Sequence, residues 1–279
     1  MRPDAMMWAE IAVEAAPEEH EFLGDLFLSV AGCAGYATEG RNVVGYLPVD
    51  DRLEGALLRL REAVERPLSI RRRLAEEDWA HAWKQYFKPQ RIGDRFVVKP
   101  SWEDYAPSEG QVVIEIDPGM AFGTGLHATT RLCLRAIESR MAPGALVSDV
   151  GTGSGILGIG AALMGAERVH ARDIDPLAVG VARANVAMNA VGDRMVVDEG
   201  ATPPAGEHDL VLANILPDVL LGMADALVDS VRPGGHLVLG GIVEPRLADV
   251  RAGFAALGLE ILDCPVEGEW AAVIARKAV

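Results

Sequence analysis

The sequence predicts an α/β protein in which a doubly wound, Rossmann-like parallel sheet follows a small ferredoxin-like α+β domain. Three observations lead to this fold class. Apolar strands alternate with helices through the C-terminal half, and a glycine turn follows the first of these strands. The order strand–helix–strand–strand–helix–strand fills the N-terminal quarter. We therefore expect a ferredoxin-like domain over residues 1–75, a linker over 76–100 and the larger domain over 101–279.

Local signals delimit the N-terminal elements. Pro17 and the pair Asp50-Asp51 mark the starts of two helices, and Gly40 with Asn42 marks a hairpin. The expected elements are strand 7–14, helix 17–30, strands 35–39 and 42–47, helix 51–65 and strand 68–74.

The C-terminal elements follow in an alternating order. Pro176, after Asp175, begins one helix, and Pro233-Gly-Gly235 ends another. Two extended runs between Leu259 and Arg276, joined by a short Glu-Gly turn, are expected to form a terminal β-hairpin. The other expected elements are strand 146–150, helix 155–164, strand 167–173, helix 176–189, strands 194–199 and 208–214, helix 217–231, strand 235–241 and helix 245–257.

A nucleotide-type site is predicted where the first strand of the larger domain ends. The strand runs into the tight turn Gly151-Thr-Gly-Ser-Gly155, which opens a helix, and Asp173 ends the next apolar run. Glycines let the backbone approach a ligand, the helix N-terminus offers free N–H groups, and a later carboxylate can bind ribose hydroxyls. A buried turn without a ligand is the alternative to this interpretation.

The identity of the nucleotide depends on the charges near the turn. Gly153-Ser-Gly-Ile-Leu-Gly158 satisfies the dinucleotide fingerprint, so an NAD-dependent oxidoreductase is one candidate. However, Asp149 precedes the turn and would face a cationic ligand better than a pyrophosphate, and no Arg or Lys follows in the loop. S-adenosylmethionine, with its adenosine and its positive sulfonium, fits these features. The terminal hairpin also favours a methyltransferase sheet over a dehydrogenase sheet.

Four segments resemble the bacterial methyltransferases of ribosomal protein L11, and a fifth resembles the linker of that family. The segments are Asp117-Pro-Gly-Met-Ala-Phe-Gly-Thr-Gly-Leu-His-Ala-Thr-Thr130, Asp173-Ile-Asp-Pro176, Ala213-Asn-Ile-Leu216, Glu267-Gly-Glu-Trp270 and the linker-like run Glu76-Glu-Asp-Trp-Ala-His-Ala-Trp-Lys-Gln-Tyr-Phe-Lys-Pro89. The resemblance implies a class I enzyme that uses S-adenosylmethionine to methylate lysine side chains and the N-terminal amine of ribosomal protein L11. It also implies that the first domain recognises this substrate. A methyltransferase of another protein or of a small molecule is the nearest alternative.

The resemblance also implies the site residues. Cofactor contacts are expected from Thr130, Gly151, Asp173, Asn214, Phe122, Gly153 and His127. Asn214 is in addition the candidate catalytic residue, since its amide can accept a hydrogen bond from the attacking amine. No residue qualifies as a dedicated base.

Local interpretations compete with these roles. His127 can bond its own loop, Asp175 is better explained as a helix cap, Asp149 can serve as an acceptor for backbone N–H groups, and Asn214 can be a turn residue before Pro217.

Charge and cysteine content restrict the partners. A net charge of −15 disfavours nucleic acid or an anionic membrane as the main substrate and suits a basic protein, although it is equally consistent with an acidic soluble proteome. The three cysteines have no metal-binding spacing, so no metal is expected. The chain shows neither a run of eighteen apolar residues nor a secretion signal. A cytoplasmic monomer is expected.

Overall fold

The computed structural model describes residues 7–16, 19–33, 36–64, 66–74, 88–117, 127–203 and 208–279. The chain divides into two compact units, with the main boundary between Lys88 and Pro89. Each unit is described by itself below. Within the described residues, no helix is both long and apolar enough to cross a membrane.

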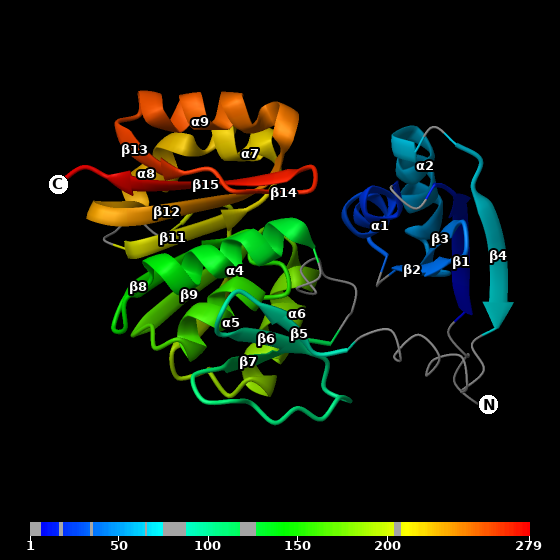
Figure 1. Ribbon diagram of the computed structural model, residues 1–279, viewed down its shortest axis with the longest axis horizontal. Helices are drawn as coiled ribbons and strands as arrows, with labels where there is room; N and C mark the ends of the chain where they lie inside the picture. The colour runs from blue at the N-terminus through cyan, green and yellow to red at the C-terminus, as the bar shows by residue number, and fades with distance from the viewer. Residues whose placement is uncertain are drawn as a thin grey trace. The chain divides into compact units, whose positions relative to one another are not determined.

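The N-terminal unit is a four-stranded antiparallel sheet with two helices (Figure 1). Its elements are β1 (Met7–Glu14), α1 (His20–Ser29), β2 (Tyr36–Glu39), β3 (Asn42–Pro48), α2 (Leu53–Val64) and β4 (Ser69–Leu74). The strand order is β2-β3-β1-β4, so the first strand lies between the third and the fourth. Ile11, Phe27 and Leu60 are fully buried in its core, and together they connect β1, α1 and α2.

The larger unit contains an eight-stranded mixed sheet. Its strands are β8 (Leu146–Val150), β9 (Arg168–Asp173), β10 (Met195–Glu199), β11 (His208–Asn214), β12 (Val231–Val243), β13 (Leu259–Asp263), β14 (Val266–Glu267) and β15 (Trp270–Lys277). The order is β10-β9-β8-β11-β12-β15-β13, with β14 paired to β15. The first five strands in this order are parallel, and β15 is antiparallel to both β12 and β13.

Helices cover both faces of this sheet. Successive side chains of a strand point to opposite faces, so the buried residues of β11 alternate between two cores. Leu210 and Leu212 of β11 belong to a core shared with α4 (Ala128–Arg140), α5 (Ile156–Leu163) and α6 (Pro176–Met188). Val211 and Ala213 belong to a second core. That core is shared with α7 (Pro217–Gly222), α8 (Ala224–Ser230) and α9 (Leu247–Ala256), which follows the 3-10 turn η3 (Glu244–Arg246). Figure 1 shows α7 and α9 on one side of β12 and β15, and α4 on the other.

A separate three-stranded sheet packs on the first of these cores. It is built from β5 (Gln90–Ile92), β6 (Phe96–Lys99) and β7 (Val112–Glu115) in the order β5-β6-β7. The fully buried side chains of Phe96 and Ile114 pack in the core that also contains Leu134 and Ile159 of α4 and α5. Residues 90–99, which the sequence assigned to a linker, are therefore strands of the larger unit.

Three other boundaries differ from the sequence expectation. The single helix expected over 217–231 is two helices, because Met223 leaves the helical conformation with φ −117° and ψ 18°. Strand β12 begins before the Pro-Gly-Gly run rather than after it. Thr130 ends the glycine-rich segment 117–130, for which the sequence indicates a loop, but it lies in the first turn of α4.

Candidate functional site

Three predicted site residues meet at the carboxyl edge of the parallel strands. Gly151 follows β8, while Asp173 ends β9 and Asn214 ends β11. Strand β8 lies between β9 and β11, and Ala213 pairs with Val150, so Asn214 follows beside Gly151. The chain leaves β8 toward β9 and returns on its other side with β11. This reversal of strand order is where ligands bind in open α/β sheets.

The glycine turn is shaped by its backbone and by close neighbours. Gly151 has φ +69°, and a Cβ atom there would lie 2.3 Å from Cγ2 of Ile215. Gly155, at φ +85°, is the residue from which α5 begins. Both positions therefore require glycine, because L side chains rarely adopt this conformation. The turn stays close to the sheet, since the N–H groups of Gly151 and Thr152 both donate to the carbonyl of Arg172.

Asp173 is tied to the turn by two backbone bonds. Its Oδ2 accepts the N–H of Gly153 at 2.9 Å, and its Oδ1 accepts the N–H of Asp175 at 3.0 Å. Asp175 itself caps α6 by accepting the N–H of Leu177 at 2.9 Å, as the helix-cap interpretation predicted. The half-buried Asp173 carboxylate is thereby held at the edge of the sheet.

Asp149 does not face a ligand, and the sequence argument that used it is wrong on this point. Its side chain is 1 % exposed and accepts the hydroxyl of Thr152 at 2.6 Å and the N–H of Gly158 at 3.0 Å. Burial raises the pKa of this carboxyl to about 6, and the charge of Asp173 adds to the increase. Asp149 therefore supports the glycine turn from beneath, which was the competing interpretation.

His127 forms the N-cap of α4. Its Nδ1 accepts the N–H of Thr129 at 3.3 Å and lies 2.7 Å from the hydroxyl of the same residue. The imidazole is 2 % exposed, and its ring centroid lies 4.5 Å from that of Trp270. Trp270 pairs with Val243, the last residue of β12, so α4 begins at the same carboxyl edge as the other site residues.

Two predicted residues carry buried polar atoms that lack a hydrogen-bond partner among the described residues. They are the hydroxyl oxygen of Thr130, which is 0 % exposed, and Oδ1 of Asn214. Such atoms are rare in folded proteins. A Cβ atom on Gly240 would lie 2.6 Å from this Oδ1 and from Sγ of Cys133, so the absent side chain at Gly240 makes room for the Asn214 amide. Phe122 lies outside the described residues.

The comparisons with known proteins agree with this geometry. A family model described as ribosomal protein L11 methyltransferase (PrmA) matches residues 39–278. The chain belongs to this family. It is 42 % identical over 306 residues to the ribosomal protein L11 methyltransferase of Pelotomaculum thermopropionicum, covering 97 % of this chain and 99 % of that one. The corresponding protein of Geobacter metallireducens is 41 % identical over 294 residues, covering 96 % and 97 %.

One solved structure supports the same membership. The crystal structure of a ribosomal protein L11 methylase from Lactobacillus delbrueckii subsp. bulgaricus matches with a TM-score of 0.65 and 32 % identity. It covers 69 % of this chain and 100 % of that one. Membership in the L11 methyltransferase family favours the methyltransferase interpretation of the glycine turn over the dinucleotide one.

Sequence reasoning missed two features of this family member's site. The first is a bulge in β12 at Gly240-Gly241, where the pairing with β15 shifts register and Gly241 has φ +74°. The two adjacent glycines are the sequence feature from which this bulge could have been predicted. The second is the contact between Glu267 and α4, for which the sequence offers only the Glu-Gly-Glu-Trp run itself.

Proposed function

We propose that this chain transfers methyl groups from S-adenosylmethionine to lysine side chains and to the N-terminal amine of ribosomal protein L11. Family membership over nearly the whole chain is the observation that carries this proposal. The relatives are named for this substrate, and the arrangement of Gly151, Asp173 and Asn214 at one sheet edge supports the proposal.

The residues at the carboxyl edge suit S-adenosylmethionine. Asp173 can accept the two ribose hydroxyls through charge-assisted hydrogen bonds, while Gly151 and Gly153 let the backbone approach the methionine part. The hydroxyl of Thr130, which has no hydrogen-bond partner among the described residues, fits a polar group of the ligand. His127 contributes by capping α4, and Phe122 is proposed as an apolar wall. No phosphate is required by any of these groups.

Asn214 is proposed as the residue that places the substrate amine. When bound, S-adenosylmethionine supplies a methyl group on a positively charged sulfur. Asn214 Oδ1 would accept an N–H bond from the neutral amine and so direct the nitrogen lone pair at that carbon. The substrate ammonium would first lose a proton to water. The C–N bond would then form as the C–S bond breaks, and the neutral thioether S-adenosylhomocysteine would leave. Because the transfer is downhill, placement is the main contribution of the protein.

The N-terminal unit is proposed as a ferredoxin-like domain that recognises the protein substrate. The order β2-β3-β1-β4 with two helices supports the fold assignment. The predicted cofactor residues all belong to the other part of the sequence, which leaves substrate placement as the natural use of this domain. The reversed β15 supports a methyltransferase-type terminal hairpin. We also propose that the protein is a cytoplasmic monomer that does not bind nucleic acid directly.

The decisive test combines binding and transfer. We expect the purified chain to bind S-adenosylmethionine and not NAD, and to label ribosomal protein L11 when it is given radioactive S-adenosylmethionine and a ribosomal protein extract. Labelling of a different protein would show that ribosomal protein L11 is not the substrate. Binding of NAD in place of S-adenosylmethionine would show that the protein is not a methyltransferase.

A deletion of residues 1–75 tests the division between the units. We expect cofactor binding to persist and labelling of the ribosomal protein to fall below detection. Labelling at the full-length rate would remove the N-terminal unit from substrate recognition. Because the truncated chain can fail to fold, full-length variants on the exposed faces of α1 and α2 provide the second measurement.

A further inference from the structure

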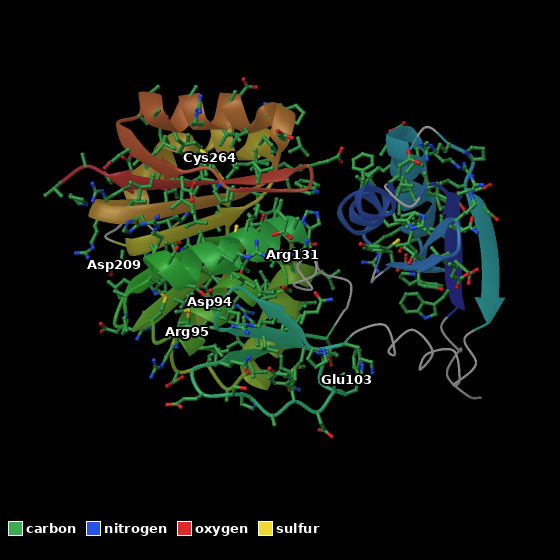
Figure 2. All side chains as sticks on the ribbon, in the orientation of Figure 1. Asp94, Arg95, Glu103, Arg131, Asp209 and Cys264 are labelled. Atoms are coloured by element: carbon green, nitrogen blue, oxygen red, sulfur yellow. The ribbon has the colours of Figure 1, made fainter. Side chains whose placement is uncertain are left out.

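The carboxylate of Glu267, in the tight turn 267–270 that joins β14 to β15, binds two arginines of α4. Oε1 of Glu267 accepts from Nε of Arg131 at 2.5 Å, and Oε2 accepts from Nη1 of Arg135 at 2.6 Å. The side chains of Arg131 and Glu267 are only 19 % and 25 % exposed. Shielding from water strengthens such a pair relative to an exposed surface bridge. Figure 2 shows Arg131 at the end of α4 that lies nearest β14.

The same turn contacts α4 a second time through Trp270. Glu267 and Trp270 face each other across Gly268 and Glu269, with Gly268 at φ +60°. The Trp270 ring meets the N-cap residue His127 at 65° between the ring planes. Both contacts therefore come from one tight turn and reach the first turns of one helix.

This helix start lies at the same carboxyl edge of the sheet as the candidate site. Thr130 lies one residue before Arg131, and its buried hydroxyl has no partner in the described part of the chain. A shift of the helix by one ångström would displace this hydroxyl by a comparable distance, which is enough to weaken a hydrogen bond substantially.

We propose that Glu267 and Trp270 are positioning residues that hold the start of α4, and with it Thr130, in the place that cofactor binding requires. This inference rests on the proposed function, since it assumes that S-adenosylmethionine binds at this edge. The effect of the two residues is transmitted through the ion pairs to Arg131 and Arg135 and through the ring contact with His127.

The test measures the dissociation constant of S-adenosylmethionine by titration calorimetry for Glu267→Ala and Glu267→Gln. We expect Glu267→Ala to weaken binding about tenfold, which corresponds to about 1.4 kcal/mol, and Glu267→Gln to weaken it less. Glu260→Ala is the matched control. Glu260 belongs to the same group of antiparallel strands and accepts a hydrogen bond from Arg276, but its bond does not reach α4.

Transmission through Thr130 is tested by combining variants. In a Thr130→Val background, Glu267→Ala should cost little further affinity, because the hydroxyl that it positions is already gone. If Glu267→Ala fails to fold, Arg135→Ala removes one of the two ion pairs at a half-exposed position and takes its place.

The outcomes distinguish a failure of the proposed function from a failure of the positioning role. Absence of binding by the wild-type chain overturns the proposed function. Wild-type binding with an unchanged constant in Glu267→Ala overturns the positioning role. An equal loss in Glu260→Ala shows general weakening of the terminal strands and also overturns it, as does full additivity with Thr130→Val.

Discussion

The carboxylate of Asp173 accepts the backbone N–H of Gly153, with Oδ2 and the nitrogen 2.9 Å apart. This bond joins the end of β9 to the glycine turn that follows β8. We therefore propose two functions for Asp173 in this site. It shapes the turn against which a ligand lies, and its remaining lone pairs are available for ribose hydroxyls.

Substitutions of Asp173 test whether it binds the cofactor. Asp173→Ala should weaken binding of S-adenosylmethionine at least 100-fold, because each charged hydrogen bond to ribose contributes about 1.5–3 kcal/mol. Asp173→Asn should lose less affinity. Titration calorimetry measures both.

Asp175→Ala is the control for this prediction. It removes the cap of α6 and should cost about 1 kcal/mol of stability without changing the affinity for the cofactor. Unchanged affinity in Asp173→Ala would take that residue out of the site.

Gly240→Ala should reduce methyl transfer by displacing the Asn214 amide. The added Cβ would lie 2.6 Å from both Asn214 Oδ1 and Cys133 Sγ, a distance that forces one of them to move. We expect at least a tenfold lower kcat. Gly180→Ala is the control, since a Cβ there meets nothing within 4 Å and should stabilise α6 by about 0.5–1 kcal/mol.

A double variant tests whether this effect passes through Asn214. In an Asn214→Ala background, Gly240→Ala should change kcat little. A further tenfold loss there would show that Gly240 acts on another part of the site.

Glu138 of α4 should matter for stability rather than for chemistry. Its carboxylate accepts the backbone N–H groups of Asp94, Arg95 and Phe96, at 3.0, 2.8 and 2.9 Å, and so holds the turn between β5 and β6 on α4. Glu138→Ala should lower the free energy of unfolding by about 2 kcal/mol, and Glu138→Gln by less. Denaturation in urea measures this loss. Glu167→Ala, an exposed carboxylate of the same unit, should change it little, and an equal effect of both would contradict the assignment.

The sequence predicts the sheet edge better than it predicts the helix that faces it. Gly151 follows one apolar run, Asp173 and Asn214 each end another, and the carboxyl ends of parallel strands necessarily meet at one edge. The sequence indicates a loop at the start of α4, because glycines precede His127 and the N-cap is an imidazole in place of the usual Ser, Thr, Asp or Asn.

Asp149 and Glu267 show why the remaining features of the site could not be predicted. An acidic residue before a glycine turn is compatible with pointing at a ligand or beneath the turn, and only packing around Thr152 and Gly158 decides between them. The partners of Glu267 lie 136 and 132 residues away, and no local pattern indicates a contact over such a separation.

His127 should make stability depend on pH. Burial, with a smaller contribution from the charge of Arg131, lowers its pKa from 6.5 to about 4. The unfolded chain therefore takes up this proton near pH 6.5, whereas the folded chain does so only near pH 4. The stabilisation is present above pH 6.5 and is lost as the pH falls toward 4, by at most about 3 kcal/mol.

Asp149 acts in the opposite direction, so variants are needed to isolate His127. The raised pKa of Asp149 means that the folded chain binds its proton first, which adds stability as the pH falls from about 6 toward 4. His127→Asn keeps an N-cap acceptor but does not titrate. The wild-type advantage in unfolding free energy over this variant should therefore be larger at pH 7 than at pH 4.5, whereas Asp149→Asn should show the reverse trend. Urea denaturation at both pH values measures the difference, and an advantage over His127→Asn that is independent of pH would show that His127 titrates alike in the folded and unfolded chains.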